Sequence, residues 1–288
     1  MARDVPQLDI QQVALSQNEE KEAKAFDKAA DQLDKTQLRT SDWTFLRYRN
    51  ATLGKPLFDA YPDLVFKSLG KLCNVDSSKQ SAKPLNGIKI LDLGSGDGSW
   101  SVILAEQGAD VTSIEISPKQ VELAYQRMKI HNMIWEAKVG SAYELKSKFE
   151  GGSFDFVFGQ GILHHLTLDL ERVCAQVPYL LKPGGCAIFT EPYSGSRWLR
   201  WLRERFAWMV PLDKESPDER PLIPSDLRIL QQYFKSVEIT YSDLFEKFAR
   251  RIFRSKKMEA VMVAIDQRIL KIRFLSHYGG IIFIVVKN

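Results

Sequence analysis

The chain has 288 residues, of which 44% are hydrophobic, 11% aromatic and 26% charged, a composition that excludes a disordered chain. Forty basic against 36 acidic side chains leave a net charge of +4, too small to indicate nucleic-acid binding. Three widely spaced cysteines without CxxC spacing exclude a disulfide framework and a structural zinc site.

Two observations bear on location. The start, MARDVPQLDIQQ, lacks the basic and apolar regions of a secretory signal. The longest apolar runs, such as 281–286, have six residues and fall far short of the roughly 20 residues that span a bilayer. We therefore expect a cytoplasmic protein without a transmembrane segment.

The N-terminal part of the chain is expected to be helical. Residues 19–33, 42–49 and 58–72 have helical patterns, and a polar, turn-rich stretch follows at 73–87. These features predict a helical cap over residues 1–75 and a second domain over 76–288.

Short apolar runs then alternate with helical segments. Strands are expected at 88–93, 111–116, 134–139, 154–158 and 186–190, and helices at 100–107, 118–131 and 166–181. This alternation predicts βαβ units and a doubly wound, mostly parallel α/β sheet, whose apolar strands are covered on both faces.

The last third of the chain departs from this alternation. Helical insertions are expected at about 192–232 and 243–279, with strands at 237–241 and 280–286. Residues 192–288 carry 18 basic and 11 acidic side chains, so the basic excess belongs to this part.

The most informative stretch is ILDLGSGDGSW at 90–100. It places Gly94, Gly96 and Gly98 where a strand turns into a helix, so that backbone N–H groups can approach a ligand closely. A dinucleotide fingerprint requires a third glycine or alanine at the position of Ser99. Asp92 would also repel a pyrophosphate, whereas it suits a ligand with an ammonium group.

Glu115 ends the second expected strand, 19 residues after Gly96. A carboxylate there can accept hydrogen bonds from both hydroxyl groups of a ribose. The implied ligand has a ribose, no pyrophosphate and an amino-acid head, and S-adenosylmethionine meets all three requirements.

At this point the sequence resembles the class I S-adenosylmethionine-dependent methyltransferases. LDLGSGDG, VTSIEIS, FDFVFGQGILHHL and LLKPGG resemble the motifs of that family in the family's order, over residues 88–191. The resemblance implies a seven-stranded sheet of order 3-2-1-4-5-7-6 with strand seven antiparallel. It also implies S-adenosyl-L-methionine as cofactor and S-adenosyl-L-homocysteine as product.

The same resemblance implies roles for particular residues. The residues expected to bind the cofactor are Asp92, Gly94, Ser95 and Gly96 at the methionine part, Glu115 at the ribose, Ile116, Ser141 and Ala142 at the adenine, and Gln160 and Gly161 near the sulfonium. Many members have an aspartate after strand three that accepts from the adenine amino group. This chain has Gly140-Ser141-Ala142 there, so Ser141 is left as a weaker acceptor.

The candidates for catalysis follow strands four and five. His164 can titrate near neutral pH and is the candidate general base, although a structural role for the His164–His165 pair is the alternative. Glu191 and Tyr193 flank Pro192, which ends strand five, and are expected over the pocket. The alternative for Glu191 is a carboxylate that binds the N–H groups of a helix terminus.

Aromatic and basic side chains predict the acceptor pocket. Trp198, Arg200 and Trp201 belong to a helical stretch that is read as a lid over an apolar acceptor, a basic mouth for an anionic one, or a packing helix. Tyr48 is placed over the sulfonium by cation–π attraction, with a core tyrosine as the alternative. The basic run 247–257 leaves a peripheral membrane contact and a solvated helix open.

The function expected from these features is methyl transfer to oxygen, nitrogen or carbon of a small, largely apolar acceptor, for example in specialised metabolism. The alternatives are C-methylation of a prenyl diphosphate, an NAD-dependent oxidoreductase and a non-catalytic nucleoside-binding scaffold. No His, Cys or Asp cluster in the sequence indicates a metal, and no nucleic-acid partner is expected. The sequence does not indicate the oligomeric state.

Overall fold

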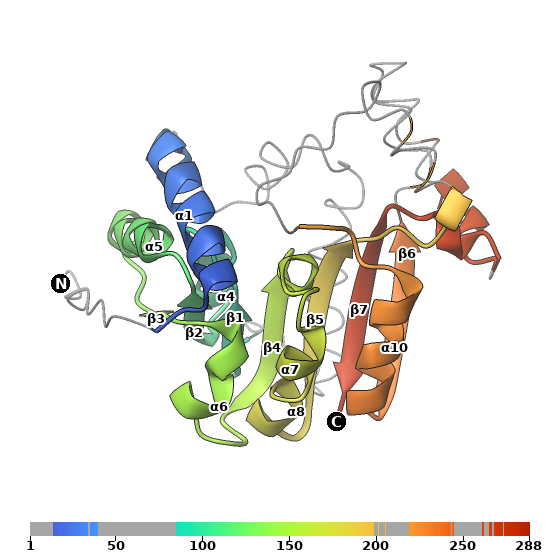
Figure 1. The fold of residues 1–288 in the computed structure, drawn as a ribbon. Coiled ribbons are helices and arrows are strands. Elements are labelled where there is room, and N and C mark those ends of the chain that lie inside the picture. The colour runs from blue at the N-terminus through green and yellow to red at the C-terminus, as the bar shows by residue number, and fades with distance from the viewer. Residues whose placement is uncertain are drawn as a thin grey trace.

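The computed structural model describes residues 14–33, 35–39, 85–198, 219–242 and 274–288, together with positions 201, 205, 244, 261, 265–266 and 268–272. Seven strands form one sheet in the order β3-β2-β1-β4-β5-β7-β6 (Figure 1). The strands are β1 (Lys89–Leu93), β2 (Asp110–Glu115), β3 (Glu136–Val139), β4 (Phe154–Gln160), β5 (Leu181–Pro192), β6 (Ser236–Ser242) and β7 (Ile281–Lys287). The predicted strand order is confirmed, as is the antiparallel pairing of β7 with β5 and β6.

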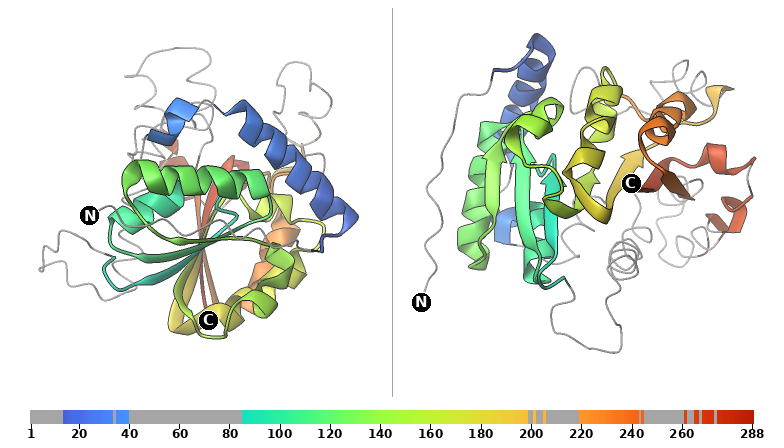
Figure 2. Two further views of the ribbon diagram at one scale, coloured as in Figure 1. Left: turned by 90° about the vertical axis from the view of Figure 1, so that its left-hand side faces the viewer. Right: turned by 90° about the horizontal axis from the view of Figure 1, so that it is seen from below.

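Helices cover both faces of this sheet (Figure 2). The α-helices are α1 (Gln17–Gln32), α4 (Ser99–Glu106), α5 (Pro118–His131), α6 (Leu145–Lys148), α7 (Leu170–Cys174), α8 (Val177–Leu180) and α10 (Pro224–Tyr233). Four 3-10 helices lie at η1 (Lys35–Arg39), η2 (Ala142–Glu144), η3 (Leu163–His165) and η4 (Ser276–Tyr278). One apolar core joins α4 and α5 to the sheet, and a second joins α6, α7, α8 and α10 to its other face. The doubly wound α/β architecture is thereby confirmed.

The helix expected over 166–181 is replaced by two short helices, α7 and α8. Pro178 has no N–H to donate, and its ring would clash with the carbonyl group of Cys174 in a continuous helix. Strand β5 is longer than expected and begins at Leu181, with an irregular register between Phe154 and Phe156 of β4. The LKPGG segment therefore forms the start of this strand as well as the approach to it.

Helix α1 begins with a capping box, in which Ser16 and Glu19 bind one another's backbone N–H groups. It packs against α5, with Ala30, Leu38 of η1 and Leu123 in a small apolar cluster. The helices expected at 42–49 and 58–72, the middle of the insertion at 192–232 and most of the insertion at 243–279 lie outside the described residues. No helix in the part of the chain that the structure describes is both long and apolar enough to cross a membrane.

Candidate active site

The glycine bend lies between β1 and α4, at the carboxyl edge of the sheet. Gly94, Gly96 and Gly98 all have positive φ values, between 53° and 76°, which residues other than glycine rarely adopt. A Cβ on Gly98 would lie 2.8 Å from the ring of Trp135, and one on Gly94 would overlap Ile162. A Cβ on Gly96 would meet nothing within 4 Å, so the space beside this residue is open.

Two buried carboxylates flank the bend. Asp92 is the penultimate residue of β1 and accepts a hydrogen bond of 2.6 Å from the hydroxyl group of Ser101. Glu115 ends β2, and its two oxygens accept from the backbone N–H groups of Gly96 and Ser117, each at 3.0 Å. Because each carboxylate oxygen has two lone pairs, Glu115 can still accept from a ligand.

Burial disfavours the charged form of both groups. It raises the pKa of Asp92 to about 7, and the negative charges of Glu115 and Asp97 act in the same direction. Burial also raises the pKa of Glu115, although the N–H groups of Ser117 and Gly96 partly oppose this. A cationic group bound between Asp92 and Glu115 would favour the charged form of both carboxyls.

A buried ion pair fixes the bend to α5, and sequence reasoning missed it. Nη2 of Arg127 lies 2.9 Å from a carboxylate oxygen of Asp97, and Nε of the same arginine donates to the Asp97 carbonyl oxygen at 3.0 Å. Asp97 also accepts from the backbone and hydroxyl groups of Ser99. The sequence signal was an aspartate between two glycines, but its partner lies 30 residues further along the chain.

At the expected adenine position, a carboxylate from the N-terminal helix contacts the segment that follows strand β3. The hydroxyl group of Ser141 donates to Glu19 of α1 and accepts from the backbone N–H of Tyr143 at 3.0 Å. Burial would raise the pKa of Glu19, but the hydrogen bonds from Ser141 and Ser16 lower it overall. The chain thus places an ionised carboxylate beside Ser141, which sequence reasoning also missed.

Helix α1 crosses the carboxyl edge of the sheet (Figure 1), and its side chains contact residues at the ends of three strands. Besides Glu19 at the end of β3, Asp27 accepts from the Ser117 hydroxyl group at 2.6 Å after β2. After β4, the ring of Phe26 meets that of His165 edge-on at 5.2 Å. Ile116 and Ala142 lie in the same region, directly after Glu115 and Ser141 in sequence. The structure therefore brings the predicted ribose and adenine residues together beneath α1.

The end of β4 supplies an unsatisfied polar atom. The side-chain oxygen of Gln160 is buried and has no hydrogen-bond partner among the described residues. Gly161, with φ 66°, follows it and donates to the carbonyl oxygen of Thr190 at 2.9 Å. A buried amide oxygen without a partner is costly, so a donor from a ligand would stabilise this position.

Glu191 is bound by the loop after β4. Its carboxylate accepts from the backbone N–H groups of Ile162, Leu163 and His164 at 3.0, 2.8 and 3.2 Å, and lies 2.8 Å from Nδ1 of His164. This geometry favours the predicted alternative, in which Glu191 binds the N–H groups at the start of η3, over a catalytic role.

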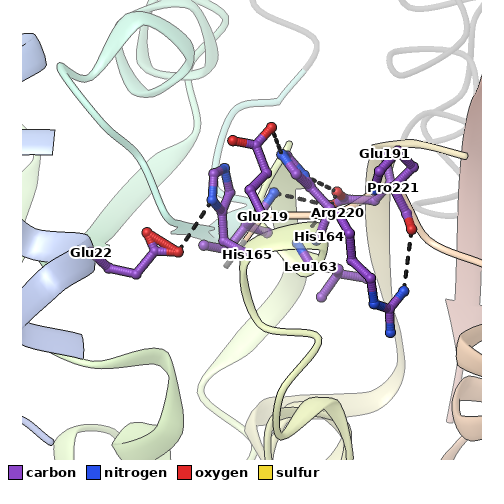
Figure 3. Close-up of polar contacts among 9 residues, drawn as sticks. Glu22, Leu163, His164, His165, Glu191, Glu219, Arg220 and Pro221 are labelled. Atoms are coloured by element: carbon purple, nitrogen blue, oxygen red, sulfur yellow. Dashed lines mark hydrogen bonds and ion pairs between the residues drawn. The ribbon is translucent and has the colours of Figure 1, made fainter. Parts of the chain in front are cut away.

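His164 lies between Glu191 and Glu219, with its Nε2 atom 3.4 Å from the Glu219 carboxylate (Figure 3). Burial alone would lower the pKa of His164, but its hydrogen bonds and proximity to these two carboxylates raise it to about 9. His164 is therefore protonated at neutral pH, which argues against the predicted role of general base there.

The remaining predicted residues have different surroundings. Tyr193 is fully buried in the apolar core, with its ring 5.5 Å from that of Tyr241, and this packing favours a structural role. Trp198 and Trp201 are 63% and 55% exposed. Tyr48 and Arg200 lie outside the described residues.

The donor set fits the predicted cofactor. An open glycine bend lies beside two buried carboxylates that suit a cation and a ribose, and an unpartnered amide oxygen ends the neighbouring strand. Asp92, Glu115 and Gln160 would hold S-adenosylmethionine, whose positive charge the buried acidic groups favour.

Comparisons with known proteins find similarity to methyltransferases. A family model described as a methyltransferase domain matches residues 90–185. A ubiquinone biosynthesis O-methyltransferase from Rhizobium leguminosarum is 27% identical over 187 residues, which are 61% of this chain and 73% of that protein. An uncharacterised methyltransferase from Synechocystis is 36% identical over 116 residues, 40% of this chain and 52% of its own.

A solved structure has the same fold. The S-adenosylmethionine-dependent methyltransferase from Archaeoglobus fulgidus matches with a TM-score of 0.50 at 16% identity, covering 78% of this chain and 94% of its own. The strand order, the domain match over residues 90–185 and the relatives together support a methyltransferase domain of the class I S-adenosylmethionine-dependent type in this chain.

Proposed function

We propose that the protein methylates a hydroxyl oxygen of a small, largely apolar acceptor. The observation that carries this choice is the match over 187 residues to O-methyltransferases of ubiquinone biosynthesis, which favours oxygen over nitrogen or carbon. Trp198 and Trp201 follow β5 at the carboxyl edge of the sheet, where open α/β sheets place their ligands, and their exposed rings suit an apolar acceptor.

The cofactor would lie across the glycine bend, at the carboxyl ends of β1 and β2. When bound, it supplies an electrophilic methyl group on a positively charged sulfur. We expect Asp92 to attract the ammonium group of the methionine part and Glu115 to accept from the ribose hydroxyls. The open space at Gly96 would let the backbone approach the ligand, and Gln160 would accept a donor at the methionine end.

Glu19 would complete the adenine contact. The amino group of adenine needs an acceptor, and the ionised Glu19 carboxylate reaches Ser141, the predicted acceptor. An ionised acceptor makes a hydrogen bond roughly twice as strong as a neutral one, so Glu19 would compensate for the missing aspartate after β3. Helix α1 would then be part of the binding site.

The experiment that tests the acceptor is a methylation screen with isotope-labelled S-adenosylmethionine over phenols, catechols, amines, quinones and prenyl diphosphates. We expect label on hydroxyl-bearing apolar compounds, and none with the Glu115→Ala variant. Label on amines or prenyl diphosphates alone would replace the proposed acceptor. If S-adenosylhomocysteine binds but no compound is methylated, a non-catalytic nucleoside-binding scaffold would be the better interpretation.

A further inference from the structure

A cluster of metal-ligand side chains lies beside the site. Among the described residues, His164, His165 and Glu219 each place one ligand atom within 4.8 Å of the others. The histidines come from η3 after β4, and Glu219 comes from the segment before α10. That segment runs beside η3, with the backbone N–H of Arg220 3.5 Å from the carbonyl oxygen of His164.

The spacing of the ligand atoms suits a small ion. Nε2 of His164 and Oε1 of Glu219 are 3.4 Å apart. Two neighbouring ligands of a tetrahedral ion with bonds of about 2.0–2.1 Å are separated by roughly 3.4 Å, which the bond length and the tetrahedral angle fix. Figure 3 shows the Glu219 carboxylate above both imidazole rings, whose centroids are 4.0 Å apart.

Carboxylates orient both histidines from the other side. Nδ1 of His164 lies 2.8 Å from Glu191, and Nδ1 of His165 lies 3.4 Å from Glu22 of α1 (Figure 3). Metal-binding histidines almost always hold their second ring nitrogen in this way, because the carboxylate fixes the tautomer and the ring orientation. Here two separate carboxylates, from β5 and α1, lie at the Nδ1 atoms of the two rings.

Charge and burial also agree with a cation. Both histidines are buried, and the carboxylates of Glu22, Glu191 and Glu219 surround them. The neighbouring Arg220 is directed away from the cluster, toward Asp226 at 2.7 and 3.1 Å. Two imidazoles and one carboxylate are a donor set that suits Zn²⁺ in sites with three protein ligands.

We propose that His164, His165 and Glu219 bind one divalent transition-metal ion of the Zn²⁺ type in a tetrahedral site with one open position. The ion would link the loop after β4 to the segment before α10, and Glu22 would connect the site to α1. Binding requires both imidazoles to be neutral, so it would release the proton that His164 otherwise carries.

The test uses the full chain, stripped with a chelator and titrated at pH 8 with Zn²⁺ by calorimetry. Replacement by Co²⁺ is followed by its visible absorption. We expect one equivalent of Zn²⁺ and the absorption of four-coordinate Co²⁺. His165→Ala and Glu219→Gln should lose the ion, whereas Glu22→Gln should weaken it by about 10–100-fold, as for other residues that orient a ligand.

The matched control is His277→Ala, which removes an exposed histidine outside the cluster. It should bind Zn²⁺ like the wild type. Thermal unfolding of each metal-free variant shows whether the fold is kept, and Glu219 lies on a connecting segment where the substitution by glutamine preserves volume. The proposal is overturned if the wild type binds no Zn²⁺, or if folded Glu219→Gln binds it as tightly as the wild type. The contacts within the cluster would then be hydrogen bonds and ion pairs alone.

Discussion

Asp92 lies in a buried environment that disfavours its ionised form. The pKa of Asp92 is about 7 in the folded chain, compared with an ordinary 3.8. Between these two pH values, Asp92 is protonated in the folded chain and ionised in the unfolded chain. Stability therefore falls as the pH rises through this window, because the folded state binds more protons. The cost is the consequence of burying a carboxylate where a cationic ligand is to bind.

The substitution Asp92→Asn should separate stability from binding. Asparagine can still accept from Ser101, and it removes a desolvated charge. At pH 8 we expect the cofactor-free variant to be more stable than the wild type by about 2–4 kcal/mol, from the size of the pKa shift, and to show little difference near pH 4. Denaturant unfolding at both pH values measures this. A variant that is less stable at pH 8 would refute the assigned cause.

Gly96 allows a test of the open space at the bend. Gly96→Ala should cost about 1–2 kcal/mol through its left-handed backbone and weaken S-adenosylhomocysteine by at least about tenfold, because the methyl group fills the space of the ligand. Gly152→Ala is the control, since Gly152 also has positive φ and no atom within 4 Å of a Cβ. It should lose similar stability but no affinity. Equal affinity in both variants would show that the ligand lies elsewhere.

At the scale of elements, α1 is the part of the site that sequence reasoning did not connect to the cofactor. The helix itself was predicted from its pattern, because helical periodicity is local. Its contacts with Ser117, Ser141 and His165 join residues about 90 to 140 positions apart, and no local pattern encodes such pairings. For the same reason, the sequence alone did not predict the pairing of Arg127 with Asp97 or of Glu219 with the two histidines.

Glu19→Gln tests whether α1 contributes to recognition of the adenine. Glutamine preserves the capping box, so the helix should remain, while the ionised acceptor is lost. We expect the variant to bind S-adenosylhomocysteine about tenfold more weakly. The ratio of its affinities for S-adenosylhomocysteine and for S-inosylhomocysteine, which lacks the amino group, should fall.

The control for this substitution is Glu20→Gln, on the exposed neighbour that pairs with Lys24. It should leave both affinities unchanged. If Glu19→Gln keeps the full preference for adenine, Glu19 serves only to hold α1 against β3.

At the scale of the whole molecule, the order of elements and the two-sided core follow from sequence. Continuous apolar runs in β1, β4 and β5 are typical of strands that are covered on both faces of the sheet. The glycine bend with its two acidic residues identifies the edge of the sheet that binds the ligand. Sequence reasoning was wrong about the helix over 166–181, although Pro178 could have shown the break. The roles of His164 and Glu191 depend on contacts between distant segments, so only the structure could weigh their alternatives.

The central claim is that two carboxylates at the glycine bend bind the cofactor, and a calorimetric titration with S-adenosylhomocysteine tests it most directly. The wild type should bind one equivalent, and Glu115→Ala should bind roughly 100-fold more weakly, because two hydrogen bonds from ribose hydroxyls to a charged acceptor are lost. Undiminished affinity in a folded Glu115→Ala variant would contradict the account.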